Sequence, residues 1–136
     1  MNTLEYRLEN KQSIKTFEAI TSLETSIRFF VNYWVNEGIV YENRGNYFSN
    51  GKYIIDLYEC KDEQPYADVV EKAPNTIEYR LFYSERKIIK ESTEKNLEEI
   101  MLALSLDSVT IENSTYKRLS LEFDEDRKVY VYYLNG

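Results

Sequence analysis

The chain has 136 residues, of which 43% are hydrophobic and 30% charged, a composition typical of one globular domain rather than of a disordered chain. Its net charge is −7 and its basic residues are scattered, which argues against nucleic-acid binding because phosphate contact needs a clustered positive surface. It has no histidine, the commonest general base and metal ligand, and one cysteine, so we expect neither a cysteine–histidine pair nor a disulfide within the chain.

Hydropathy and the first residues favour a cytoplasmic protein. No apolar run approaches the roughly 18–20 residues that a membrane span needs, and residues 1–10 are too polar for a secretory signal peptide. A lone Cys60 fits a reducing compartment. The acidity is that of an ordinary soluble protein or, alternatively, of a protein with an acidic face for a basic partner.

The first elements form a probable hairpin. Leu4, Tyr6 and Leu8 alternate with charged residues, which is the period of a half-buried strand. A second, weaker strand pattern covers residues 13–20.

A helix is expected next. Thr21 and Glu24 have the spacing of a capping box, in which each side chain accepts from or reaches back to the other residue's amide. Gly38 is a plausible end of this helix, because glycine takes the left-handed conformation freely. The apolar stripe that the helix would bury consists of Leu23, Ile27, Phe30, Val31 and Trp34.

Two strands complete this part of the chain. The first begins at residues 39–42, is interrupted by a turn or bulge at residues 43–46, and resumes at Tyr47. Asn50-Gly51 predicts a type I′ hairpin turn, which requires positive φ at both central residues. The return strand covers residues 52–60.

One seven-residue motif occurs twice and organises the rest of the chain. Residues 2–8 and 75–81 are identical at six positions, and the seventh is Leu4 in place of Ile77. The elements after the second motif follow the order seen after the first. Ser92 or Thr93 is the expected cap of the second helix. The expected apolar stripe of that helix is Leu97, Ile100, Met101 and Leu104. The last strand of the chain, residues 129–134, is expected to be buried on both faces.

These patterns predict an α+β fold built from two tandem units. Each unit reads strand-strand-helix-strand-strand, the first over residues 1–60 and the second over residues 75–136. Residues 61–74 form a polar linker, in which residues 66–72 could make a short helix. One such unit buries little, so we expect the duplicated units to form a single domain of antiparallel sheet with the two helices packed on it. The alternative is a chance similarity of two strands.

The acidic and thiol groups do not form a recognisable catalytic or metal motif. Cys60 lacks a base to raise its thiolate fraction. Residues 124–126 are acidic but lack the spacing and the glycine of a calcium loop, so they are expected to form a polar hairpin turn. Asp62 and Glu63 are expected to be a solvated pair. We therefore expect no enzyme, no cofactor and no metal.

The charged residues of the repeated motif are the first candidate surface. Glu5, Arg7, Glu78 and Arg80 should point away from the face that Tyr6 occupies, because strand residues two apart share a face. Ion pairs between the two copies are the main interpretation, a symmetric recognition patch the second, and a pair of glycosidase carboxylates the third.

Tyrosine is the compositional outlier, with 13 residues, and some must be exposed because not all can bury a satisfied hydroxyl. The leading hypothesis is an acidic, non-catalytic binding protein, such as a bacterial-type inhibitor, immunity-like protein or adaptor that engages a protein partner. The alternative is a small-molecule site with a tyrosine-lined pocket between the units. Self-association through a strand edge at residues 4–8 is also open. The candidate partner surface comprises Tyr41, Tyr47, Tyr58, Tyr116, Tyr132, Glu5, Arg7, Glu78 and Arg80.

Overall fold

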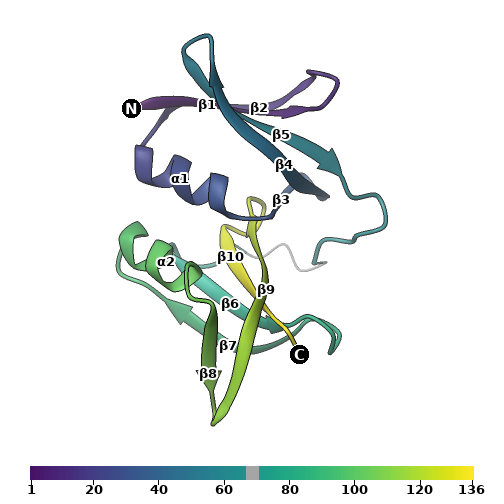
Figure 1. Cartoon of the computed structure of the whole chain (residues 1–136), viewed down its shortest axis with the longest axis vertical. Helices are drawn as coiled ribbons and strands as arrows, with labels where there is room; N and C mark the ends of the chain where they lie inside the picture. The colour runs from purple at the N-terminus through teal and green to yellow at the C-terminus, as the bar shows by residue number, and fades with distance from the viewer. Residues whose placement is uncertain (67–70) are drawn as a thin grey trace.

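The computed structural model describes residues 1–66 and 71–136, which form one mixed sheet of ten strands with two helices (Figure 1), so the α+β class is confirmed. The expected short helix over residues 66–72 rests largely on residues outside those described. The elements in chain order are β1 (Asn2–Leu8), β2 (Ser13–Ile20), α1 (Ser22–Phe30), β3 (Tyr33–Asn36), β4 (Ile39–Ser49), β5 (Lys52–Glu59), β6 (Thr76–Leu81), β7 (Lys87–Thr93), α2 (Leu97–Leu104), β8 (Ser108–Ile111), β9 (Ser114–Asp124) and β10 (Val129–Leu134).

The prediction of a purely antiparallel sheet is wrong. The strand order is β2-β1-β5-β4-β3-β9-β10-β6-β7, with β8 beside β9, and three pairs are parallel: β1 with β5, β3 with β9, and β6 with β10. Alternation along the sequence identifies the hairpins, which are antiparallel as expected. It does not indicate which strands of different hairpins pair with each other. The three parallel pairs all form between strands of different hairpins.

The two halves of the chain, residues 1–60 and 75–136, have the same order of neighbours. β1 lies between its hairpin partner β2 and the parallel strand β5, and β6 lies in the same way between β7 and β10. Each half contains one strand more than expected, because a short strand (β3 or β8) follows the helix. Both motif strands therefore occupy the same position within their half.

Helix α1 begins where expected and ends earlier. The Glu24 amide donates to Thr21 Oγ1 at 3.1 Å, which confirms the cap. The helix stops at Phe30, because Asn32 leaves the helical path and hydrogen-bonds with Leu121 of β9 through its backbone amide and its side chain. Trp34 consequently lies in β3. The expected helix end, Gly38, instead lies in the β3–β4 turn with φ +77°.

The other turn and cap predictions have mixed outcomes. Asn50 and Gly51 both have positive φ (52° and 79°) between β4 and β5, as a type I′ turn requires. The irregularity near Asn43 is a bulge in a continuous β4. Helix α2 is capped by Asn96, which accepts from the Glu99 amide, and not by Ser92 or Thr93, which belong to β7.

The core lies between the sheet and the two helices, which sit beside each other on one side of it (Figure 1). Tyr6 stacks on Trp34 with ring centroids 3.7 Å apart, and both are fully buried. Arg28 of α1 crosses to the second half, where it donates to Glu125 at 2.8 Å in a buried ion pair. One core thus joins both halves. Within the described residues, no helix is long and apolar enough to cross a membrane.

Candidate binding face

The sheet has a second face, opposite the helices, which we call the outer face. Leu4 and Tyr6 of β1 point into the core, so Glu5 and Arg7 lie on the outer face. The same alternation places Glu78 and Arg80 of β6 there. The motif therefore contributes its charged pair to the outer face in each half.

In the second half this face is buried. Glu78 accepts from Arg80 Nε at 2.9 Å and from Arg127 at 2.8 Å, and Arg127 also pairs with Asp124 at 2.7 Å. Glu78 is fully buried and the other three groups nearly so. Burial alone would raise the pKa of Glu78, but the two arginines hold it below its ordinary value.

Two described residues of the linker, Tyr66 and Lys72, lie against this cluster. The Tyr66 ring lies over Arg80, with its centroid 3.7 Å from the guanidinium carbon, and 4.8 Å from that of Arg127. Its hydroxyl is 2.7 Å from the hydroxyl of Tyr133, and the Lys72 amide donates to the Arg127 carbonyl at 2.8 Å. Both arginines therefore lie within cation–π distance of the Tyr66 ring.

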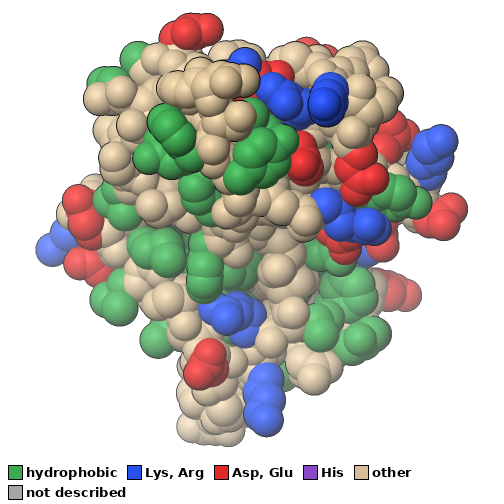
Figure 2. Space-filling view, turned by 45° about the horizontal axis from the view of Figure 1, so that its top comes forward, with side chains coloured by type: hydrophobic (Ala, Val, Ile, Leu, Met, Phe, Trp, Pro, Cys, Tyr) green, Lys and Arg blue, Asp and Glu red, His purple; other side chains and the backbone are tan. Residues whose placement is uncertain are grey.

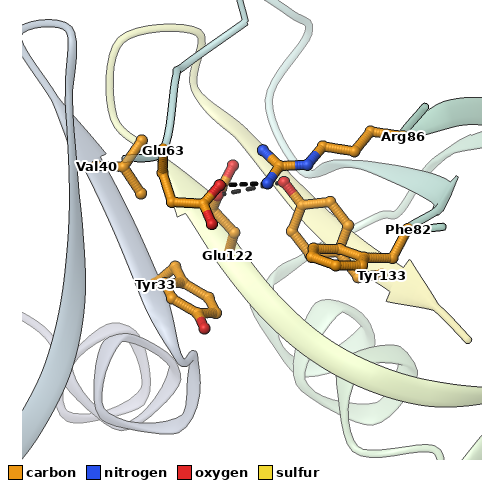
Figure 3. Close-up of a pocket in the computed structure, with 7 residues that line it drawn as sticks. All are labelled: Tyr33, Val40, Glu63, Phe82, Arg86, Glu122 and Tyr133. Carbon is orange, nitrogen blue, oxygen red and sulfur yellow. Dashed lines mark hydrogen bonds and ion pairs between the residues drawn. The ribbon is translucent and has the colours of Figure 1, made fainter. Parts of the chain in front are cut away.

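A small pocket beside the linker contains a buried acid (Figure 3). Arg86 reaches across to Glu63 of the linker, and Glu122 lies behind this pair. The pocket encloses about 30 Å³, room for about one water molecule. Glu122 accepts from Tyr133 at 3.3 Å, while its Oε2 has no hydrogen-bond partner among the described residues. Burial, with the charge of Asp124, raises the pKa of Glu122 to about 7.

In the first half the outer face has similar charges, but among the described residues no linker ring lies over them, and Glu5 and Ile54 are buried by neighbouring side chains. Glu5 is buried between Arg7, 3.2 Å away, and Lys52, and these two cations lower its pKa to about 2. The Tyr47 hydroxyl donates to Asp56 at 3.3 Å. Tyr47 is 41% exposed, whereas in the covered half Tyr66 is half-buried and Tyr133 is buried.

The strand register assigns each outer-face residue of the first half an equivalent residue in the second half. In one outer row of the first half, Ile54 lies between Glu5 and Tyr47. In the equivalent row of the second half, Val131 lies between Glu78 and Glu122. In the next outer row, Arg7 lies beside Asp56 and Arg80 beside Tyr133. Each half thus has a Glu–Arg pair and a tyrosine–carboxylate hydrogen bond of 3.3 Å, with tyrosine and acid exchanged between the strands.

A groove borders the open face of the first half. It encloses about 440 Å³ and runs along the start of the linker, where Tyr58 is 49% exposed and Arg44 lies 4.3 Å above its ring. Figure 2, in which the first half comes forward, shows hydrophobic side chains in separate patches among charged ones. The groove is lined by Tyr33, Glu42, Arg44, Tyr58, Cys60, Lys61, Asp62 and Glu63.

Two of the predicted surface tyrosines are not at the surface. Tyr41 and Tyr132 belong to the core, and the Tyr132 hydroxyl donates to the Leu106 carbonyl. Tyr116 is half-buried against the same core. Tyr41 shares β4 with Tyr47, but the bulge between Asn43 and Gly45 turns the two side chains to opposite faces of the sheet. Tyr41, Tyr116 and Tyr132 all lie on the side of the core. Tyr47 and Tyr58 are exposed on the outer face as predicted.

The predicted ion pairs between the motif copies do not form. Glu5 pairs with Arg7 and Glu78 with Arg80, each within its own strand, because β1 and β6 lie near opposite edges of the sheet. Asp124 ends β9 and Glu125 begins the β9–β10 turn, and both are buried ion-pair partners rather than the polar turn residues expected. Glu63 is likewise paired, with Arg86.

Several residues of this face were not singled out from the sequence. The outer face of the second half includes Tyr66, Glu122 and Arg127. The outer face of the first half includes Arg44 and Asp56. A lone aromatic residue in a polar linker is the signal that could have found Tyr66. The thiol of Cys60, in the groove, has its pKa raised by burial, which lowers its reactivity. In the described part of the chain, no cluster of three acidic or thiol groups could hold a metal ion.

Comparison with known proteins finds no matching family model, no similar curated protein and no similar solved structure.

Proposed function

We propose that the chain is a non-catalytic binding protein that engages a protein partner through the outer face of its first half. The observation that carries this proposal is the difference between the halves: the ring of Tyr66 in the linker lies over Arg80 of the second half, while no described aromatic ring lies over Arg7 of the first half, whose side chain is 18% exposed. Tyr47 and Tyr58 stand exposed there beside Arg7 and Arg44, and tyrosine and arginine are the residues enriched in interface hot spots.

The net charge of the molecule does not select the partner. The open face carries three cations, Arg7, Arg44 and Lys52, against the same number of carboxylates, Glu5, Glu42 and Asp56. An inhibitor, immunity-like protein or adaptor in a bacterial cytoplasm is the form of binding protein that fits a compact acidic domain. Its partner need not be strongly basic.

The shared strand order supports the further proposal that the two halves arose by tandem duplication. In that history the second half acquired a permanent cover from the linker, and the first half kept its face free for another chain.

A small-molecule site is the second candidate. The groove of about 440 Å³ is large enough for a small ligand, and Tyr33 and Tyr58 line it. The pocket of about 30 Å³ at Glu122 is too small for such a ligand. A ligand in the groove would contact the edge of the same open face.

The test is a capture experiment from extract of the cells that make the protein. Three baits are compared: the wild type, the double variant Tyr47→Ala/Tyr58→Ala, and the control Leu102→Ala, whose side chain is exposed on α2 on the other side of the sheet. We expect a stoichiometric protein on the wild-type and control baits, with at least tenfold less on the double variant. The same captured proteins on all three baits, or none on any, would overturn the proposal.

A further inference from the structure

The covered half shows which kind of group the charged motif accepts. A segment without strand structure crosses Arg80, places a tyrosine ring 3.7 Å above the guanidinium, and joins the tyrosine hydroxyl to the next side chain in the row, Tyr133, at 2.7 Å. The ring also packs against apolar outer-face residues of β10. The chain thus contains one copy of the charged motif whose arginine is covered by a tyrosine ring, and among the described residues the arginine of the other copy has no such ring.

We propose that the open face binds an extended segment of a partner protein that presents a tyrosine, whose ring stacks on Arg7 and whose hydroxyl donates to Asp56. This inference rests on the proposed function and specifies its partner. Arg7 corresponds to Arg80 in the strand register, and Asp56 corresponds to Tyr133. Because a carboxylate replaces the phenol at that position, the bond to the incoming hydroxyl is charge-assisted.

The guanidinium of Arg7 is held in an orientation on which a planar ring can stack. Arg7 is held by Glu5 through Nε at 3.3 Å and the terminal nitrogen at 3.2 Å, so its guanidinium is fixed in orientation while part of the side chain remains exposed. Arginine in this state presents a flat, weakly hydrated cation that stacks well on aromatic rings. Tyr47 borders the site and is already hydrogen-bonded to Asp56, which leaves further acceptor capacity on that carboxylate.

The site discriminates among aromatic residues. Phenylalanine would keep the stacking and lose the hydrogen bond to Asp56. Tryptophan would place its ring nitrogen differently. An extended backbone suits the position, because the covering segment of the second half, at Tyr66, is likewise outside helices and strands.

The test uses a random 12-residue peptide library displayed on phage and selected on the full-length chain. We expect selected peptides to share a tyrosine, to bind Leu102→Ala like the wild type, and to bind Arg7→Ala at least tenfold more weakly. Arg7→Lys keeps the charge without the planar group, so it should recover little of the loss. A peptide in which the tyrosine is replaced by phenylalanine should bind about tenfold more weakly, the effect of one hydrogen bond to a charged group. Thermal unfolding of each variant checks that it is folded.

Selection of peptides without a common tyrosine, of none at all, or of tyrosine peptides insensitive to Arg7→Ala would overturn the inference. A dimer of the chain alone that dissociates in Tyr47→Ala would also overturn it, by assigning the face to a second copy. The two proposals fail separately: if the partner from cell extract depends on Tyr47 and Tyr58 but not on Arg7, the proposed function holds and the tyrosine contact is overturned.

Discussion

Glu122 illustrates how one side chain can tie the stability of this protein to pH. Its carboxyl is 4% exposed, and Tyr133 supplies its one hydrogen bond among the described residues. Burial raises its pKa from 4.5 to about 7, so the folded state holds a proton that the unfolded state has lost between these pH values. Stability from this group is therefore complete below about pH 4.5 and decreases as pH rises toward 7.

Replacing this acid by its neutral isostere tests that reasoning. Glu122→Gln should unfold like the wild type at pH 5 and be more stable at pH 8, by on the order of 3 kcal/mol, because the wild type must then bury a charge. Urea unfolding at both pH values measures the difference. An equal effect of the substitution at pH 5 and pH 8 would contradict the assignment.

The acid limb of the pH profile belongs to other residues. Glu5 and Glu125 have their pKa values lowered to about 2, the first by Arg7 and Lys52, the second by Arg28 and Trp34 against the opposing effect of burial. A lowered folded-state pKa gives stability that is present above about pH 4.5 and lost as pH falls toward 2. Glu122→Gln should leave this limb unchanged.

At the scale of elements, helix α1 is fastened by a charge pair rather than by its length. Arg28 pairs with buried Glu125 at 2.8 Å and with half-exposed Glu24 at 3.3 Å. Removing one partner of a buried pair leaves an uncompensated charge, whereas an exposed pair contributes little. Arg28→Ala should therefore lower the free energy of unfolding by about 3–5 kcal/mol and Glu24→Gln by less than about 1 kcal/mol. Similar losses in the two variants, measured by denaturant unfolding, would contradict this account.

Tyr66 is the linker side chain that lies over the ion pairs of the second half. Tyr66→Ala removes the ring over Arg80 and should cost about 2 kcal/mol, less than the loss of a fully buried aromatic residue, because Tyr66 is half-buried. Tyr66→Phe keeps the ring and loses the hydroxyl contact with Tyr133, about 1 kcal/mol. Thermal unfolding compares the two variants. Equal stability of Tyr66→Ala and the wild type would show that the linker does not seal the second half.

For the whole molecule, local patterns predicted the hairpins, the Thr21 cap and the outward direction of the motif charges, because each depends on residues close in sequence. The end of α1 did not follow, since Trp34 fits the helical stripe equally well and its place in β3 depends on pairing with the distant β9. The burial of Glu78 depends in the same way on the linker. Tyr132 could not be assigned to one face, because all of β10 is apolar or aromatic.

The difference between a covered and an open outer face is a property of the whole chain, and hydrogen exchange tests it most directly. The exchange of backbone amides is compared for the chain alone and with the partner captured from extract. The account predicts slower exchange in β1, β4 and β5 on binding, with α2 unchanged. Protection confined to α2, β7 or β8 would contradict the claim that the open face of the first half is the binding surface.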